Sequence, residues 1–515
     1  MKTKNILPRI FNFFCWIVLI GIFFLNLIHI YRGDIVFHTD IARDFLVMEE
    51  IIQENKPTLI GPKSGGVSGV FHGPAWYYLN LPVFYLSGGN PAIISIFWLT
   101  LYLFGFYIFY LLSKKVLGCQ VALASTTLLA SLSMFMSMAL GQQSPSFFLS
   151  IVLLYFVYSY LQDCKWWQVS ATMLVLGFII QFQMAFGGPM LLIFGPYLIF
   201  KIIKTKKYSH LLALGSILIP LSTFILFDLR HDFLQSRSVM RYFSERDTND
   251  DWTLIKYANH RFWAIVDCFS IIKTSTILKI LTVILSLMAF VSAGIINKKS
   301  SHNKAQQFWF ISLLMITGFW LITIPFRGEI QGYYYESLLP VICLWFGYAI
   351  LKFKNKVGVI LLSLIICFNF YTGIKNAYYY LLSDVSDYEI NWSFYSKLAN
   401  DIFKNTDQEF GYYVFTTDQF GYQAKYAMNY YSKNLFRKTQ LNKKAPITYL
   451  IIGRNDYKNP FANEEFWQKE QVRIDRVADD SWEYQSGYKV LRYNLSEEEL
   501  LIESDPNLIE GLHFR

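Results

Sequence analysis

Long apolar segments fill this chain from near its N-terminus to about residue 380, and they constrain its fold more than any other feature. About eleven of them approach the roughly 20 mostly apolar residues with which a helix crosses the hydrocarbon core of a bilayer. They lie near residues 10–31, 91–113, 119–140, 145–162, 167–183, 186–203, 209–229, 275–296, 305–325, 332–351 and 357–380. The first is too long for the apolar part of a signal peptide, so we expect it to remain as an anchor.

Basic residues follow alternate segments. Lys114 comes after the second segment, Lys201 after the sixth and Lys352 after the tenth. Because basic links stay in the cytoplasm, the N-terminus is predicted to be cytoplasmic, and the links 32–90 and 230–274 and the C-terminal tail extracytoplasmic. The net charge of +9 is then mainly an orientation signal. We therefore expect a multi-pass plasma-membrane protein that contacts the lipid bilayer and does not bind nucleic acid.

The chain changes character near residue 382. Residues 1–381 are predicted to form a transmembrane domain, whereas residues 382–515 are polar and carry strand-like runs around a helical pattern from Gln419 to Tyr431. This spacing predicts a small extracytoplasmic α/β domain. The predicted fold class is therefore mainly α, a polytopic membrane helical bundle with about 11 transmembrane helices and a small α/β C-terminal domain.

The first outer loop begins with the sharpest polar motif of the chain. A helix is predicted from Asp40 to Asn55, and on it Asp40, Arg43 and Asp44 stand at positions i, i+3 and i+4, which places them on one face. A carboxylate there can act as a general base that takes a proton from an attacking hydroxyl. The same residues also fit an ordinary helix start, in which Thr39 or Asp40 caps the helix and Arg43 pairs with Asp44.

A Gly-rich loop in the same outer segment delivers His72 to the start of an aromatic helix, predicted from Ala75 to Leu86. Pro74 suits the first turn of that helix, and Tyr77 and Tyr78 follow it. His72 can donate to a phosphate or to a leaving-group oxygen, or simply to a backbone carbonyl. The loop does not end in Gly-Lys-Ser/Thr, which excludes a nucleotide-binding P-loop.

Two arginines lie at predicted outer ends of apolar segments. Arg230 closes the seventh segment, and Arg327 lies in an outer turn shortly before Tyr334 and Glu336. Arginine is permanently charged and can bind a lipid phosphate through two parallel hydrogen bonds. Arg230 equally fits an ion pair with Asp228 at the membrane interface. Tyr334 equally fits the belt of aromatic residues found at any membrane interface.

Several of these loop residues are of types that bind metals. His38, His72, His231 and Asp40 are possible ligands, but no helical His pair or Cys partner accompanies them. A divalent metal is possible but unsupported, and we expect no metal or other cofactor.

Taken together, these segments resemble the GT-C membrane glycosyltransferases. The resemblance is to the family-39, protein-O-mannosyltransferase-like group, which includes the lipid A aminoarabinose transferases. In that group the first outer loop opens with an Asp-x-x-Arg-Tyr-Ala helix. Here the matching stretch runs from Asp40 through Arg43 to Phe45, and Asp44 takes the position of the family tyrosine.

Two further stretches are similar to the same group. The first is His72-Gly-Pro-Ala-Trp-Tyr77-Tyr78-Leu79, which has His72 where the aminoarabinose transferases have lysine. The stretch from Tyr333 to Pro340 looks like the late aromatic-to-Leu-Pro helix of the family.

The resemblance implies a polyprenyl-phosphate sugar donor, an extracytoplasmic glycan, lipid or protein acceptor, and Asp40 as general base. Arg43 and Asp44 are predicted to complete the catalytic group. We expect the donor phosphate to be bound by His72, Arg230, Arg327 and Lys63. We expect further substrate contacts from His38, Tyr77, Tyr78, Tyr334 and Glu336.

Three other functions remain open at this point. A flippase or exporter of lipid-linked saccharides would carry ionisable groups at the bilayer midplane, and the apolar segments have almost none. A polysaccharide polymerase or ligase would share the large outer loops and arginines, and the motif at Asp40 favours the transferase over it. A non-catalytic receptor or scaffold would use the C-terminal domain to bind a partner.

Overall fold

The computed structural model describes residues 6–64, 67–139, 141–244, 253–272, 276–299, 303–326, 330–352, 356–382, 389–418, 420–454 and 463–508. The chain forms two compact units. Unit 1 comprises Met1–Asn26, Thr58–Leu79 and Trp98–Asn376. Unit 2 comprises Leu27–Pro57, Asn80–Phe97 and Ala377–Arg515, so it combines the C-terminal segment with two segments from near the N-terminus.

Helices long and apolar enough to cross a membrane dominate the chain before Leu382. Nine occur within the described residues. They lie in α1 (Ile6–Tyr31), α4 (Pro91–Leu117), α6 (Ser144–Asp163), α8 (Met184–Lys204), η3 with α9 (Tyr208–Ile217, Leu218–Arg230), α12 (Thr276–Lys299), α13 (Asn303–Thr323), η4, η5 and α14 (Gly332–Tyr334, Glu336–Leu338, Leu339–Lys352) and α15 (Lys356–Leu382). The other two predicted spans correspond to the shorter apolar helices α5 (Cys119–Leu132) and α7 (Trp166–Phe182). The predicted multi-pass helical architecture is confirmed.

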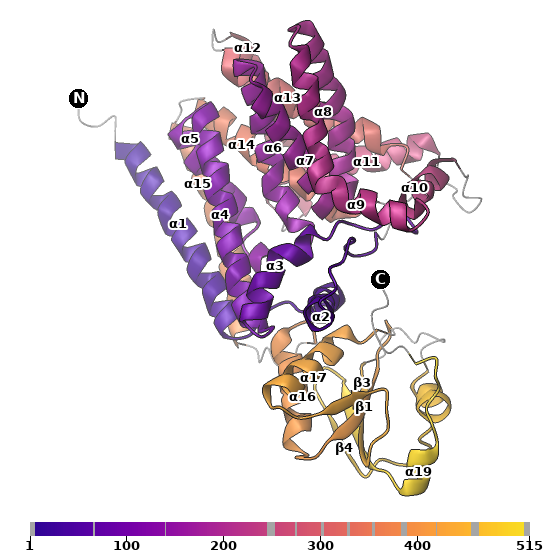
Figure 1. Ribbon diagram of the computed structural model, residues 1–515. Helices are drawn as coiled ribbons and strands as arrows, with labels where there is room; N and C mark the ends of the chain where they lie inside the picture. The colour runs from indigo at the N-terminus through magenta and orange to yellow at the C-terminus, as the bar shows by residue number, and fades with distance from the viewer. Residues whose placement is uncertain are drawn as a thin grey trace. The chain divides into compact units, whose positions relative to one another are not determined.

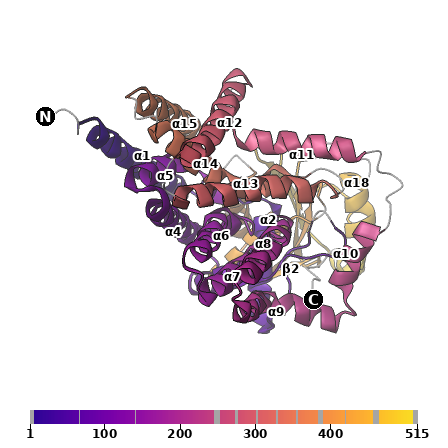
Figure 2. The same ribbon diagram turned by 90° about the horizontal axis from the view of Figure 1, so that it is seen from above.

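Close helix packing shapes the interior of unit 1. Helices α6, α7, α8 and α13 lie side by side (Figure 1, Figure 2), and α14 packs against α5 and α12. A Cβ atom on Gly347 of α14 would lie 2.4 Å from Ser125 Oγ of α5, so this close approach depends on glycine. In the span that includes α14, 83% of the most apolar 18-residue stretch is buried, the largest share among the nine.

Both long links that were predicted to lie outside the membrane contain helices. The first holds α2 (Thr39–Glu54) and α3 (Ala75–Leu86), within one residue of the stretches predicted as helical. The second holds α10 (Leu234–Ser244) and α11 (Leu254–Cys268), where no helix was predicted.

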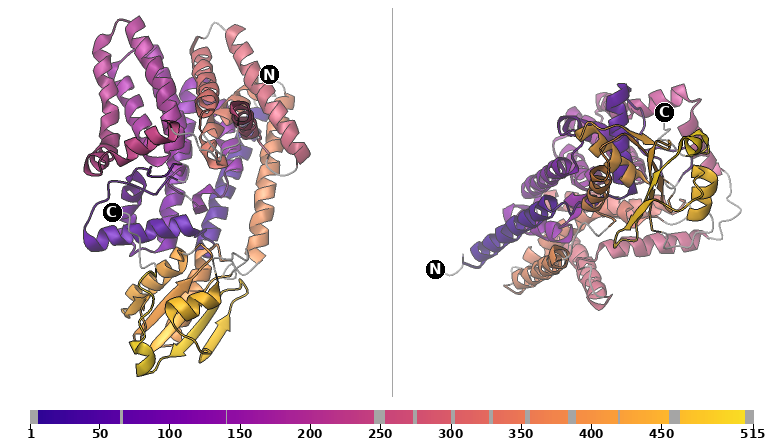
Figure 3. Two further views of the ribbon diagram at one scale, coloured as in Figure 1. Left: turned by 90° about the vertical axis from the view of Figure 1, so that its right-hand side faces the viewer. Right: turned by 90° about the horizontal axis from the view of Figure 1, so that it is seen from below.

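The C-terminal segment forms a five-stranded sheet flanked by helices (Figure 1, Figure 3). Its strands are β1 (Phe410–Phe415), β2 (Thr439–Leu441), β3 (Ile447–Ile452), β4 (Asp480–Glu483) and β5 (Lys489–Asn494), in the order β2-β1-β3-β5-β4. Strand β1 is parallel to β2 and β3, and β5 is antiparallel to β3 and β4. The helical elements are α16 (Trp392–Lys404), α17 (Tyr422–Asn434), α18 (Glu464–Phe466), a π-helix (Trp467–Val472) and α19 (Glu497–Leu501). The predicted small α/β domain is confirmed.

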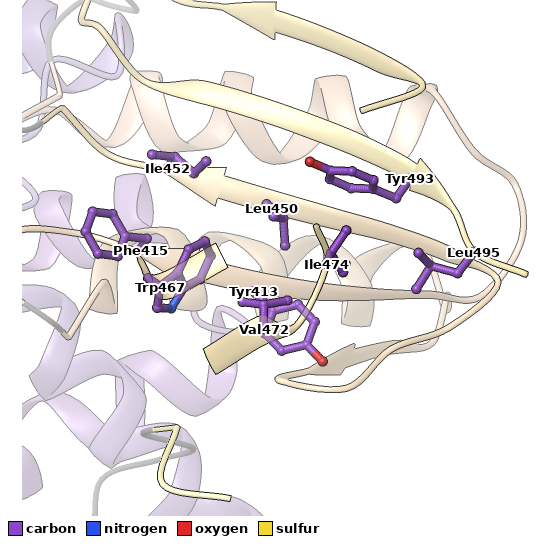
Figure 4. Packing of buried hydrophobic residues seen from close by; sticks show 9 residues of the cluster. All are labelled: Tyr413, Phe415, Leu450, Ile452, Trp467, Val472, Ile474, Tyr493 and Leu495. Atoms are coloured by element: carbon purple, nitrogen blue, oxygen red, sulfur yellow. The ribbon is translucent and has the colours of Figure 1, made fainter. Parts of the chain in front are cut away.

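The two faces of this sheet bury different side chains because successive strand residues point to opposite sides. On one face, Tyr413 of β1 and Leu450 of β3 join a cluster that includes Trp467 (Figure 4). On the other face, the ring of Phe410 lies 5.2 Å from Phe403 of α16. The sheet is therefore covered on both sides within unit 2.

Candidate functional site

The first turn of α2 gathers the predicted catalytic residues. His38 is the N-cap of the helix, in place of the Thr39 or Asp40 cap considered from the sequence, and its Nδ1 accepts the Asp40 N–H at 3.2 Å. Arg43 donates through Nη1 to Asp40 Oδ1 at 2.7 Å and through Nη2 to Asp44 Oδ1 at 2.9 Å. The helical spacing thus produces a carboxylate–guanidinium–carboxylate cluster.

The two carboxylates of this cluster differ in their surroundings. The Asp40 side chain is 69% exposed, whereas that of Asp44 is 6% exposed. Asp44 accepts two hydrogen bonds from Arg43, at 2.9 and 3.2 Å, and so holds the guanidinium in place. Asp40 therefore remains accessible to a substrate hydroxyl, which is what a general base requires.

The start of α2 is bonded to the C-terminal segment within unit 2. Thr39 Oγ1 donates to Asp418 Oδ2 at 3.0 Å and accepts from Gln423 Nε2 of α17 at 3.1 Å. Thr39 directly precedes Asp40. The position of the candidate base therefore depends on residues 379 and 384 positions further along the chain from Thr39.

The middle of α2 is held to α17 by a second set of contacts. Glu49 accepts from Asn429 Nδ2 at 3.1 Å and forms an ion pair with Lys433. The ring of Phe45 lies 5.2 Å from that of Tyr426. Polar and aromatic contacts together fix α2 along its length against the C-terminal segment.

Asp418 is the acceptor at the centre of the turn that precedes α17. Burial alone would raise the pKa of its carboxyl, but hydrogen bonds from Thr416, Gly421, Phe420 and Thr39 outweigh this and lower the pKa. The carboxylate therefore stays ionised at neutral pH and keeps accepting from Thr39.

Two basic side chains near this turn have lowered pKa values. Burial lowers the pKa of His38, opposed by the charge of Asp40 and reinforced by that of Arg43. Burial also lowers the pKa of Lys425 to about 8, and Asp418 opposes that shift. A neutral His38 agrees with its capping role, because an imidazole nitrogen that accepts an N–H cannot carry a proton.

Lys63 and His72, two predicted phosphate ligands, lie on one hairpin of unit 1. The Gly61 N–H donates to the His72 carbonyl at 2.7 Å, and the His72 N–H donates to the Pro62 carbonyl at 2.9 Å. Lys63 pairs with Phe71 in antiparallel fashion. The predicted Gly-rich loop is therefore a hairpin in which His72 is buried.

Gly73 allows this hairpin to pack against α7. A Cβ atom at this position would lie 1.8 Å from Gln181 Oε1. The Gln181 carbonyl accepts the Gly73 N–H at 2.9 Å, and Oε1 accepts the Ala75 N–H at 3.3 Å. Gln181 Nε2 in turn donates to the Pro220 carbonyl at 2.5 Å and to Thr223 Oγ1 at 2.8 Å, so Gln181 joins the hairpin to the start of α9.

Arg230 lies at the exposed end of α9. The hairpin reaches the same helix end, because the ring of Phe71 lies 5.7 Å from that of Phe227. Asp228, considered from the sequence as a partner of Arg230, accepts the Gln235 N–H at 2.8 Å and caps α10. The predicted cations of the hairpin and of α9 thus belong to connected elements of unit 1.

The remaining predicted contacts occupy other parts of unit 1. The Tyr78 hydroxyl donates to the Thr58 carbonyl at 2.6 Å, and Tyr77 is buried. Tyr334 is half-buried, and Glu336 is exposed and lines a cavity.

The structure thus brings the predicted residues together in two groups. His38, Asp40, Arg43 and Asp44 form one group in unit 2, and Lys63 and His72 share a hairpin in unit 1. Arg327 lies outside the described residues. Among the residues that are described, no group of three His, Cys, Asp or Glu side chains is placed to hold a metal ion.

Sequence reasoning missed the residues that support α2 from the C-terminal segment, chiefly Asp418 and Gln423. A local signal was present, because Asp418 shortly before Gly421 is typical of a turn that starts a helix. That signal identifies the turn, but it does not identify Thr39 as its partner.

No protein-family model matches the sequence, and no curated protein matches it. Solved structures do. The crystal structure of ArnT from Cupriavidus metallidurans bound to undecaprenyl phosphate aligns with a TM-score of 0.58 at 11% identity, covering 94% of this chain and 98% of that one. The apo structure of the same protein gives a TM-score of 0.57 at 10% identity, covering 93% and 97%. The likeness confirms the predicted GT-C fold over nearly the whole chain.

Proposed function

We propose that this protein is an integral membrane glycosyltransferase that moves a sugar from a polyprenyl-phosphate donor to an extracytoplasmic acceptor. The observation that carries the proposal is the fold shared over 94% of the chain with ArnT, whose structure holds undecaprenyl phosphate. The exposed carboxylate of Asp40 at the start of α2 supports it. We further propose a cytoplasmic N-terminus and an extracytoplasmic C-terminal domain in a plasma membrane.

Asp40 is the general base of the proposed reaction. Its carboxylate takes the proton of an acceptor hydroxyl or amine while the acceptor atom bonds to the anomeric carbon of the sugar. The bond between that carbon and the phosphate oxygen breaks, and polyprenyl phosphate leaves with the electron pair. Arg43 keeps Asp40 oriented through the 2.7 Å hydrogen bond, and Asp44 anchors Arg43.

The charge that develops on the leaving phosphate requires cations. Pre-placed donors aimed at developing charge are usually a large contribution to catalysis. We assign this part to Lys63, His72, Arg230 and Arg327. We assign further substrate contacts to His38, Tyr77, Tyr78, Tyr334 and Glu336.

The proposal is tested by transfer from defined donors. The full-length protein is reconstituted in vesicles with a panel of radiolabelled polyprenyl-phosphate sugars and an acceptor fraction from bacterial envelopes. We expect label from at least one donor to move to an acceptor, with release of polyprenyl phosphate. Movement of intact lipid-linked sugar across the vesicle membrane without any transfer would instead support an exporter and overturn the proposal.

A further inference from the structure

A cavity of about 510 Å³ lies in unit 1, and the described residues that line it include none of the hairpin. It is lined by the end of α5, the 3-10 helix η2 (Met136–Ala139), the start of α6, the turns before α14 and the second half of α15. Its volume falls within the range of about 300–1,000 Å³ that is typical of small-molecule sites. By the predicted topology all of these helix ends face outward.

Buried polar contacts hold the walls of this cavity in place. Asn26, which is fully buried, donates to the Met134 carbonyl at 2.8 Å and accepts from Ser137 Oγ at 2.6 Å. On α15, Asn369 donates to the Ile271 carbonyl at 3.0 Å. These hydrogen bonds hold the backbone at two places beside the cavity.

The lining has a definite chemistry. Its polar side chains are amides, hydroxyls and one carboxylate, and its apolar side chains include aromatic rings. The residues that define this character are Gln143, Ser144, Glu336, Asn376, Phe135 and Phe147. No Lys, Arg or His occurs among the described residues that line it.

This composition selects against one kind of ligand and favours another. A phosphate would need a cation, because charged donors make the strong contacts with phosphate oxygens. Amide and carboxylate groups pair well with hydroxyls, which both donate and accept, while the rings can pack against C–H groups. The lining therefore suits an uncharged sugar ring and not a phosphorylated head group.

We propose that this cavity binds an uncharged glycan unit of the acceptor substrate. The assignment to the acceptor rests on the proposed function, since the donor carries a phosphate for which this cavity has no described cation. Binding itself requires no catalysis, so it can be measured separately from transfer.

Saturation-transfer NMR on the purified full-length protein in nanodiscs tests the binding. The probes are the methyl glycosides of glucose, galactose, mannose and N-acetylglucosamine, with glucose 6-phosphate as the anionic comparison. We expect at least one methyl glycoside to receive saturation, and glucose 6-phosphate to receive at least about fivefold less. No saturation transfer to any of the four methyl glycosides, or a stronger signal from glucose 6-phosphate, would overturn the proposal.

Matched substitutions on α15 locate the signal. Thr372 lines the cavity, whereas the neighbouring Tyr371 is exposed. Thr372→Trp should fill the cavity and weaken binding at least about tenfold, while Tyr371→Trp should leave it unchanged. Glu336→Gln removes one acceptor charge and keeps the side-chain size, and it should weaken binding about fivefold even if Thr372→Trp fails to fold.

The outcomes separate this inference from the proposed function. Unchanged binding in both Glu336→Gln and a folded Thr372→Trp would place the sugar elsewhere and refute the cavity assignment. Sugar transfer by a protein that binds none of the glycosides would leave the proposed function standing and overturn only the cavity. Glycoside binding at the cavity without any sugar transfer would leave the binding site standing and overturn its assignment to the acceptor, because that assignment rests on sugar transfer.

Discussion

Removing Lys433 should loosen α2 more than neutralising Glu49, although both changes break the same ion pair. The Glu49 side chain is 8% exposed and that of Lys433 is 50% exposed. Lys433→Met leaves a buried carboxylate with only Asn429 as its described donor, whereas Glu49→Gln leaves an ammonium that can turn to solvent. The larger penalty belongs to the buried group that loses its partner.

The magnitude follows from these exposures. Breaking a fully buried pair by removing one partner costs about 3–5 kcal/mol, and a surface pair is worth about 0–1 kcal/mol. Because Lys433 is half-exposed, we expect about 1–3 kcal/mol for Lys433→Met. For Glu49→Gln we expect about 0.5–1.5 kcal/mol, because a hydrogen bond between charged groups is replaced by one to a neutral amide.

Native-state hydrogen exchange of the full-length protein in nanodiscs measures this directly. Amides of α2 and α17 should exchange about 5- to 150-fold faster in Lys433→Met and by a smaller factor in Glu49→Gln. Lys469→Met is the matched control, because it breaks an exposed ion pair with Glu465 on another helical segment. Equal effects of the two substitutions, or a larger one for Glu49→Gln, would refute the reasoning.

Three further predictions concern the two units separately. Gly73→Ala should destabilise the hairpin of unit 1 by about 1–3 kcal/mol, since its Cβ would meet a buried Gln181 side chain that other hydrogen bonds hold in place. A thermal melt followed by tryptophan fluorescence measures this loss of stability, and an unchanged melting temperature would contradict the prediction. Asp228→Ala should remove the cap of α10 at a cost of about 0.5–2 kcal/mol, which faster amide exchange confined to α10 would reveal. The folded-state pKa of Asp418 is lowered from 3.8, so the stabilising effect of its carboxylate on the α2 turn is present above pH 3.8 and is lost as the pH falls below 3.8. Asp418→Asn should abolish this pH dependence of amide exchange in α2, and an unchanged pH profile would contradict the prediction.

Local pattern was sufficient for most of the helical architecture. The length of the apolar segments predicted the spans, and amphipathic spacing predicted α2 to within one residue. Helices α10 and α11 were not predicted, although both are amphipathic and their charged residues, such as Arg237 and Arg241 of α10, are compatible with a surface helix. Strands β2 and β4, of three and four residues, are too short to produce an alternating pattern.

The candidate site was predictable only where it is local. The spacing of Asp40, Arg43 and Asp44 was enough to place them on one helix face. The bond between Thr39 and Asp418 joins residues 379 positions apart, and no local pattern encodes such a partner. For the same reason Asp228 was considered beside Arg230, although its carboxylate caps a helix that begins later in the chain.

The measurement closest to the central claim is sugar transfer by Asp40→Asn in reconstituted vesicles. The substitution keeps the size of the side chain and removes the charge that accepts the acceptor proton, so we expect transfer to fall by at least about 100-fold. Asp407→Asn, which changes an exposed carboxylate paired with Arg437, is the control and should transfer normally. Transfer by folded, inserted Asp40→Asn at close to the unsubstituted rate would contradict the account.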